Sequence, residues 1–350
     1  MPRKSNSPAG ETKFPSELRL DLVSKDWIVV ATGRARRPET FRKKSRVFPL
    51  EWSKAKCPFE NLDDQEHPTH AYYKGKEINI SSKTAPKLWT TLSLPNKYPA
   101  FFPSKSMKTR LVGPYQVMDG VGFHEVILTR DHKRDIPEFS LSEVAELIDI
   151  YHARYVDLMN KEFVNYISIF KNKGPEAGAT VAHPHSQLIA TPITDPDIEK
   201  SLAGSREFFE SRQECVHCLM LEWDMKDGKR IIFENDCAVA VCPFASVVAF
   251  EIRIFPKKHL SYFERITDHQ KKCLAEAFSQ VMKMLYKALK DPDYNYFLHT
   301  APVDNKDYSY YHWHWEILPK TTTWAGFEIG TGIEISTIEP ERAAEFLKKQ

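Results

Sequence analysis

The sequence of 350 residues has no run of about 20 apolar residues, the length that a membrane-spanning helix requires. Its first residues are polar and lack the apolar centre of a secretory signal, so we expect a cytoplasmic protein without a membrane partner. The charge is nearly balanced, with 49 Lys and Arg against 47 Asp and Glu. This balance gives no overall field that would recruit nucleic acid, so binding is expected at local sites.

Cysteine is scarce, with six residues in the chain, and one Cys-x-x-C spacing, Cys215 and Cys218, stands among them. In a reducing compartment these thiols are expected to be free or to ligate metal rather than to form a disulfide framework. The composition, 42% hydrophobic and 27% charged, is that of a globular protein with one large or two medium domains. Residues 1–17 are expected to be a flexible tail because they contain little apolar surface.

The chain contains an internal repeat of four elements in the same order. An alternating run ending in a histidine comes first, at 123–132 and again at 250–259. In the first half a capping box then opens a helix that runs to about residue 160, and strands follow at 165–170 and 183–187. In the second half a capping box opens a helix that runs to about residue 289, and strands follow at 295–299 and 312–316. The interval from His132 to His183 is 51 residues, and that from His259 to His312 is 53. Such agreement indicates a duplication.

The duplication predicts an α+β fold of two tandem domains, with mainly antiparallel sheets that each carry one long helix. We place the N-terminal domain at residues 18–195 and the C-terminal domain at 196–350, joined near residues 192–205. Trp27–Val30 is expected to be the first strand.

Superimposing the two halves aligns two candidate metal centres. The first consists of Cys57, Glu60, His132 and His183, and the second of Cys215, Cys218, His259 and His312. Thiolates with neutral imidazoles are ligands that zinc prefers, and a carboxylate at Glu60 is an acceptable but harder ligand. We expect one or two zinc ions with a structural role, since four protein ligands leave no position for water or substrate. In the alternative interpretation, these cysteines and histidines are ordinary core residues.

The candidate chemical centre is His183-Pro184-His185-Ser186-Gln187, where alternation in a strand places the two histidines and Gln187 on one face. With His183 committed to metal, the neutral imidazole of His185 can attack phosphorus, and the amide of Gln187 can donate to an anionic oxygen. The small-residue loop from Asn172 to Thr180 contains Gly174 and could bring backbone N–H groups close to a phosphate. The same residues could instead be a histidine pair without chemistry.

At these positions the sequence resembles the galactose-1-phosphate uridylyltransferase family of the histidine-triad superfamily, close to the branch that includes plant ADP-glucose phosphorylase. The resemblance extends from about Glu17 to the C-terminus, and His-Pro-His-x-Gln after Asn-Lys-Gly is its most specific part. The motifs that carry it are Arg34-Ala35-Arg36-Arg37-Pro38, Asn96-Lys97-Tyr98-Pro99-Ala100, Phe170-Lys171-Asn172-Lys173-Gly174, His183-Pro184-His185-Ser186-Gln187 and Gly326-Phe327-Glu328-Ile329-Gly330-Thr331-Gly332.

The resemblance implies that both domains have a histidine-triad-like fold, that the N-terminal domain is the catalytic one, and that individual residues have the following roles. His185 would take up the nucleoside monophosphate, and Gln187 would bind the transferred phosphoryl group. The remaining substrate-binding residues that it implies are Arg34 and Arg37 near the phosphates, Asn96 in a nucleoside-binding turn, Asn172, Gly174 and Thr180 in a phosphate loop, and Phe327 and Glu328 at the hexose. Without the resemblance, Glu328 would be an exposed strand carboxylate. Glu60, where the family usually has cysteine, and Lys97, where some members have an acidic residue, depart from the pattern.

The implied activity is transfer of a nucleoside monophosphate between a nucleotide sugar and a hexose 1-phosphate through a covalent nucleotidyl-histidine, with UDP-glucose and galactose 1-phosphate as the default pair and a homodimer as the expected assembly. An ADP-sugar phosphorylase that uses inorganic phosphate is the first alternative. A nucleotide hydrolase and a nucleotide- or metal-binding module remain as more distant alternatives.

Overall fold

The structure of the chain, a computed structural model, describes residues 16–31, 38–42, 54–80 and 86–350. Its strands are β1 Glu17–Leu20, β2 Trp27–Val30, β3 His70–Tyr73, β4 Lys76–Glu77, β5 Thr91–Pro95, β6 Thr109–Val112, β7 Tyr115–Met118, β8 Phe123–Thr129, β9 Tyr166–Lys173, β10 His185–Thr191, β11 Ile231–Glu234, β12 Ala238–Val241, β13 Ile252–Pro256, β14 Tyr294–His299, β15 His314–Pro319 and β16 Ile335–Ser336. Its α-helices are α1 Leu141–Leu158, α2 Pro196–Arg212, α3 Val216–Asp227, α4 Asp268–Leu289, α5 Gly326–Thr331 and α6 Pro340–Lys348.

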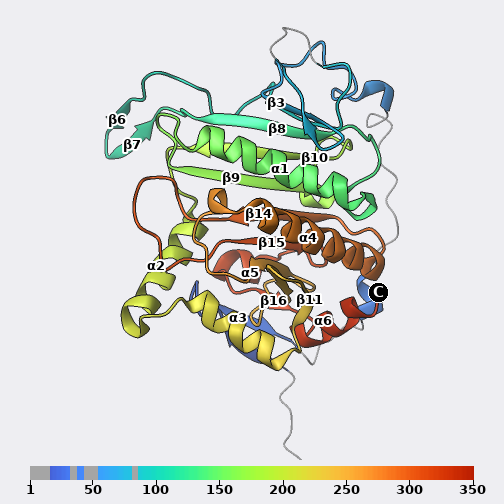
Figure 1. Cartoon of the computed structure of the whole chain (residues 1–350). Helices are drawn as coiled ribbons and strands as arrows, with labels where there is room; N and C mark the ends of the chain where they lie inside the picture. Colours follow the sequence, from blue (N-terminus) through green and yellow to red (C-terminus); the bar gives the residue numbers. More distant parts are fainter. Residues whose placement is uncertain (1–15, 32–37, 43–53, 81–85) are drawn as a thin grey trace, which may run out of the picture.

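The strands of the two halves form one continuous antiparallel sheet (Figure 1). Within the described residues its order is β11-β12-β13-β15-β14-β9-β10-β8-β5-β3-β4, and the halves join where β9 pairs antiparallel with β14. The expected α+β class with mainly antiparallel pairing is confirmed. The two expected sheets are joined edge to edge, because the β9 and β14 edges satisfy each other's backbone groups instead of facing water.

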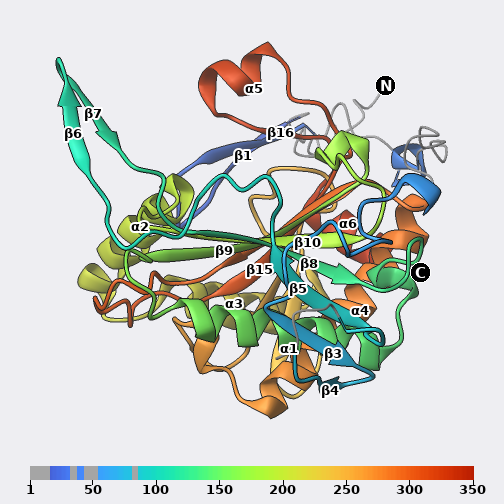
Figure 2. The ribbon, with the colours of Figure 1, turned by 90° about the horizontal axis from the view of Figure 1, so that it is seen from above.

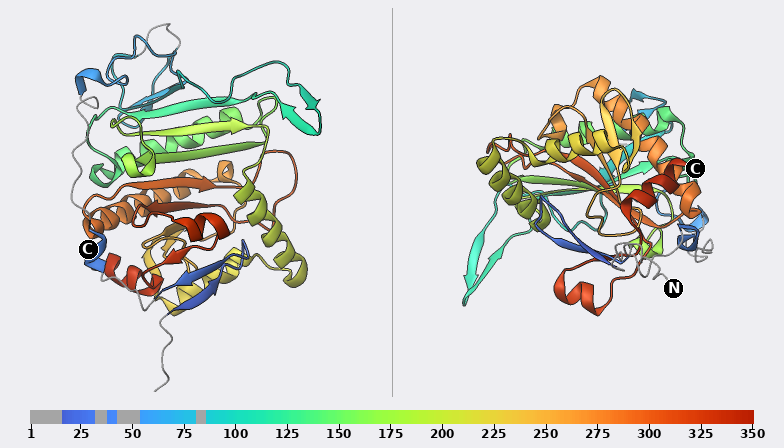
Figure 3. Two further views of the ribbon diagram at one scale, coloured as in Figure 1. Left: turned by 180° about the vertical axis from the view of Figure 1, so that it is seen from behind. Right: turned by 90° about the horizontal axis from the view of Figure 1, so that it is seen from below.

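The two long helices are confirmed at the predicted capping boxes. Ser140 caps α1 and Thr267 caps α4, each with the reciprocal bonds to the third helical residue. Both helices pack on the same face of the sheet and against each other (Figure 1), and the main apolar core lies between them and the strands. The view from behind (Figure 3) shows the opposite face of β8, β9 and β10, which α1 and α4 leave uncovered.

The first strands lie with the last elements of the chain. Trp27–Val30 is a strand as expected, and it pairs with β1 and, in parallel, with β16. Arg19 bridges Glu341 of α6 at 3.0 Å and donates to the carbonyl of Phe244. Strand β1 is therefore held against the C-terminal half of the chain.

The joining segment near residues 192–205 contains a helix, α2, which Asp195 caps. Two local expectations were wrong. The strands expected from His183 and His312 begin at His185 and His314; Pro184 has no N–H to donate to a ladder. The segment Gly326–Thr331 is a short helix rather than a strand, because the Glu328 carboxylate accepts from the Ala325 N–H and so closes the first turn.

Candidate active site and metal centres

His185 opens β10 with its ring held in one orientation. Its Nδ1–H donates to the carbonyl of His183 at 2.8 Å, which leaves the Nε2 lone pair free. Burial lowers the pKa of His185 to about 4, so the ring is neutral at pH 7. The Phe59 ring packs edge-on against it, 5.3 Å between centroids. A neutral, oriented imidazole has the form that a nucleophile requires.

The strand alternation predicted for this motif is present from His185 onward. The Ser186 hydroxyl points to the helix side, where it lies 3.1 Å from the Tyr296 hydroxyl and also contacts Tyr151 of α1. His185 and Gln187 therefore face the side of the sheet that α1 and α4 leave open. His183, which precedes the strand, is fully buried and turns toward the first metal centre.

Gln187 is oriented by a histidine that the sequence analysis missed, His124. The Nδ1 of His124 accepts from the Ala100 N–H at 3.1 Å, so its ring proton resides on Nε2, which donates to Gln187 Oε1 at 2.8 Å. Asn96 lies beside the same Nε2, at 3.1 Å. This contact chain turns the NH₂ group of Gln187 away from His124 and leaves it available for a ligand. The alternation of β8 and its pairing with β10 could have revealed His124.

The glycine loop is built differently from the expectation. Gly174 adopts φ +84°, and a Cβ there would lie 2.1 Å from the Asp293 carboxylate, so the glycine is required by a protein contact rather than by a ligand. The backbone N–H groups of residues 176–179 donate to protein acceptors, one of them Asp293 Oδ2. These four N–H groups are therefore engaged within the protein, and the phosphate loop implied for Asn172, Gly174 and Thr180 stays a prediction. The amide of Asn172, whose Oδ1 accepts from Asn295 at 2.7 Å, keeps its own NH₂ to donate.

The first candidate metal centre brings all four predicted residues together. The Nδ1 atom of His183 lies 3.6 Å from Cys57 Sγ, 3.3 Å from His132 Nδ1 and 3.6 Å from Glu60 Oε1. His183 Nε2–H donates to the Thr129 carbonyl at 2.7 Å, which fixes the tautomer that presents Nδ1 as a ligand. Glu60 Oε1 is buried without a hydrogen-bond donor. A cation would satisfy that oxygen, so these residues fit a metal ion.

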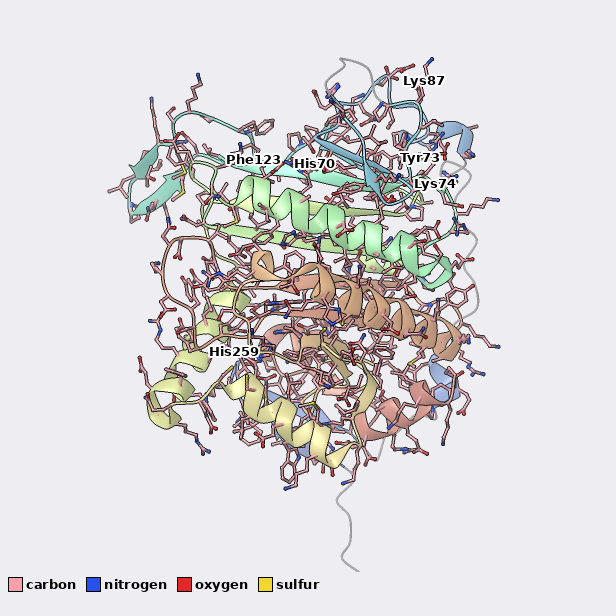
Figure 4. All side chains as sticks on the ribbon, viewed as in Figure 1. His70, Tyr73, Lys74, Lys87, Phe123 and His259 are labelled. Carbon is pink, nitrogen blue, oxygen red and sulfur yellow. The ribbon has the colours of Figure 1, made fainter. Side chains whose placement is uncertain are left out.

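In the second candidate centre, the ligand atoms of all four predicted residues lie close to one another. One ligand atom each from Cys215, Cys218, His259 and His312 lies within 4.8 Å of the others. Cys218 Sγ lies 3.2 Å from His259 Nδ1 and 3.5 Å from His312 Nδ1, and His259 Nε2 is fixed by the Ser309 carbonyl at 2.8 Å. The hydrogen bond from Cys218 lowers the pKa of the Cys215 thiol. Figure 4 shows His259 in the lower half, close to the start of α3.

A further polar group that the sequence analysis did not single out lies on the uncovered face of the C-terminal half. His299 Nε2 pairs with Glu316 Oε2 at 3.2 Å, and the rings of His299 and His314 stack 5.0 Å apart. His314, which opens β15 as His185 opens β10, is thus buried in a ring stack. The alternating polar residues of His-Trp-His-Trp-Glu were the available signal.

The remaining predicted substrate-binding residues lie on other segments of the chain. Thr180, the last residue of the glycine loop, is exposed. Glu328 caps its own helix, the Phe327 ring is half exposed, and Figure 2 shows α5 projecting from the body beside β16, away from β10. Arg34 and Arg37 lie outside the described residues. Among the described residues no helix is both long and apolar enough to cross a membrane.

Comparison with known proteins identifies the family. The model of the galactose-1-phosphate uridyl transferase N-terminal domain matches residues 11–194, and the model of a domain of unknown function matches residues 120–350. The chain belongs to the galactose-1-phosphate uridylyltransferase family.

Two curated relatives cover nearly all of the chain. An ADP-glucose phosphorylase from Arabidopsis thaliana is 31% identical over 95% of this chain and 92% of its own, and a galactose-1-phosphate uridylyltransferase from Thermotoga maritima is 28% identical over 95% and 98%. The crystal structure of an ADP-glucose phosphorylase from Arabidopsis thaliana with bound ADP-glucose has a TM-score of 0.76 at 26% identity, covering 96% of this chain and 99% of that chain.

Proposed function

We propose that the protein is a nucleotidyltransferase that moves a nucleoside monophosphate from a nucleotide sugar to a phosphate acceptor through a covalent nucleotidyl-His185. The observation that carries this proposal is the Nδ1–H···O=C bond from His185 to His183, which fixes a neutral ring with Nε2 directed away from the backbone. Gln187, held by His124, supplies an amide donor on the same face. The family membership supports nucleotidyl transfer on sugar phosphates.

In the first step, Nε2 of His185 attacks the α-phosphorus, the bond from that phosphorus to the bridging oxygen breaks, and the sugar 1-phosphate leaves with the electron pair. In the second step, an oxygen of the acceptor phosphate attacks the same phosphorus and the N–P bond electrons return to the ring. The His183 carbonyl accepts a hydrogen bond from Nδ1–H throughout, the proton stays on the ring, and this contact stabilises the positive charge on the phosphorylated ring. The Gln187 amide donates to a non-bridging oxygen as its charge rises.

Two substrate pairs fit this chemistry. UDP-glucose with galactose 1-phosphate is the leading pair, as in the Thermotoga relative, and an ADP-sugar with inorganic phosphate is the second, favoured by the higher identity to the Arabidopsis phosphorylase. Lys97 is exposed in the turn after Asn96, where it places a cation beside the proposed nucleoside site.

Intact-protein mass spectrometry after mixing with UDP-glucose or ADP-glucose, each without acceptor, tests the proposal. We expect a uridylyl adduct on His185 with UDP-glucose, mapped by fragmentation, because no acceptor is present to discharge the intermediate. An adenylyl adduct with ADP-glucose alone would favour the ADP-sugar phosphorylase over the uridylyltransferase. If neither nucleotide sugar is consumed, or if both are hydrolysed without an adduct and without stimulation by either acceptor, covalent transfer is refuted.

We also propose that zinc occupies both metal centres and has a structural role. The donor sets, Cys2His2 in the second centre and one thiolate, one carboxylate and two imidazoles in the first, match the ligands that zinc takes in tetrahedral sites. Zinc at the first centre would fix His183, and through its carbonyl it would hold His185 in position.

His124 is proposed as a positioning residue for Gln187. In His124→Ala the Gln187 amide loses the donor that orients it, so we expect kcat to fall by roughly tenfold to 100-fold with little change in KM. In His124→Gln the new Nε2 can donate in place of the imidazole and should restore most of the rate. Steady-state kinetics of both variants, with the exposed His67→Ala as control, checks this. Equal losses in both variants, accompanied by a lower Tm, would indicate a merely structural role.

The hairpin of β6 and β7 is proposed to contact a second copy of the chain in a homodimer. It extends from the body (Figure 2), and Leu111, Val112 and Tyr115 are 75%, 55% and 71% exposed. An isolated two-stranded hairpin is marginally stable in water, and exposed apolar residues that gather in one place mark interfaces. Light scattering after size exclusion should give a dimer for the wild type and Gln116→Ser, and a monomer or weakened dimer for the Leu111→Ser/Tyr115→Ser variant. An unchanged dimer in the double variant would contradict this assignment.

A further inference from the structure

A third group of metal-ligating side chains lies outside both centres described above. It consists of Cys237, His269 and Cys273, and one ligand atom from each lies within 4.8 Å of the others. Cys237 lies in the turn between β11 and β12, whereas His269 and Cys273 lie four residues apart on α4, so they face the same side of that helix. The Cys273 Sγ is 4.0 Å from His269 Nε2.

Asn235 fixes the distance between the turn and the helix. Its Nδ2 donates to the Cys273 carbonyl and to Glu276 Oε2, both at 2.9 Å. Its Oδ1 accepts from the backbone N–H of Cys237 at 3.2 Å and of Ala238 at 2.9 Å. One side chain therefore joins both ligand-bearing elements, which is how a second layer of contacts orients metal ligands.

The geometry and exposure suit a cation that enters from solvent. Ligand atoms in a tetrahedral zinc shell are about 3.5–3.8 Å apart, so small side-chain movements would bring these three atoms to coordination distance. Cys273 is buried, Cys237 is half-buried and His269 is exposed, which leaves one side of the group open to water. Two carboxylates add negative charge near this open side. Asp236 is the neighbour of Cys237 in the chain, and Glu276 accepts a hydrogen bond from Asn235.

We propose that Cys237, His269 and Cys273 form a third metal site, which binds zinc or a similar thiophilic divalent cation with water in the fourth position. Two thiolates and one imidazole are the soft donor set that selects such cations over magnesium or calcium. The bound ion cross-links the β11–β12 turn to the first turns of α4. The site shares no ligand with the two centres of the proposed function and stands independently of it.

Zinc titration of the reduced protein followed by native mass spectrometry tests the proposal. The variants are Cys237→Ser and His269→Ala, with His67→Ala as the matched control, because His67 is also an exposed histidine but belongs to none of the metal-ligating groups. We expect the wild type and the control to bind one more zinc ion per chain than the two variants, or to bind that ion more than tenfold more tightly. Equal Tm values without added zinc would show that the variants are folded.

Hydrogen exchange gives a second readout that does not depend on counting ions. Added zinc should slow exchange at residues 235–238 and in the first turns of α4 in the wild type and the control, and leave both segments unchanged in the two variants. Equal zinc content and equal protection in all four proteins would overturn the proposal. A Cys237–Cys273 disulfide that forms on removal of the reductant, in a protein with no third zinc ion, would also overturn it.

Discussion

His185→Ala is expected to lower nucleotidyl transfer by a factor on the order of 10⁴ or more, since the substitution removes the atom that forms the covalent bond to phosphorus. The fold should be retained, because His185 is only partly buried and its main polar contact is to a backbone carbonyl. The measurement is turnover of UDP-glucose and of ADP-glucose with each acceptor, together with the adduct mass of the variant.

The matched control for His185→Ala is His67→Ala, which removes an exposed imidazole elsewhere in the chain and should leave turnover unchanged. Zinc content and Tm of both variants establish that the loss is not caused by an altered metal centre. If His185→Ala retains nucleotide-sugar turnover within tenfold of the wild type, the covalent mechanism is wrong. If it loses activity while the wild type hydrolyses the nucleotide sugar without using an acceptor, the protein is a hydrolase.

Loss of the metal from the second centre is expected to lower Tm by roughly 10 °C or more, since structural zinc contributes directly to folding free energy. In Cys218→Ser, His312 and Cys215 would remain buried without the cation that pairs them. The centre connects the start of α3, the segment after β13 and the segment before β15, so three elements would lose their link. Differential scanning calorimetry with and without a chelator measures the effect.

Glu222→Gln, on the exposed side of α3, is the control for Cys218→Ser and should unfold at the wild-type temperature. Chelator should lower Tm in the wild type and in the control but have a smaller effect on Cys218→Ser, which has already lost this ion. Equal Tm values for Cys218→Ser and the wild type in the presence of zinc would refute a structural metal at this centre.

Much of the candidate site could be predicted from the sequence because its ligands recur at matched places in a duplicated frame. The interval between His132 and His183 is nearly the same as that between His259 and His312. In the structure, His183 lies beside Cys57 and His312 lies beside Cys218. The capping boxes at Ser140 and Thr267 are local signals, so they located both long helices. The strand expected at Glu328 was wrong because a helix of six residues is too short to give a pattern that differs from that of a strand.

The sequence by itself determined the repeat, the two candidate ligand sets and the candidate pair of His185 and Gln187, since each depends on residue type and on spacing along the chain. Only the tertiary structure decided that β9 and β14 join both halves into one sheet, that His124 reaches Gln187, and that Asp293 fills the space beside Gly174. These contacts connect residues that are far apart in the chain. Their partners are selected by packing and by the pairing of buried polar groups, which no local pattern records.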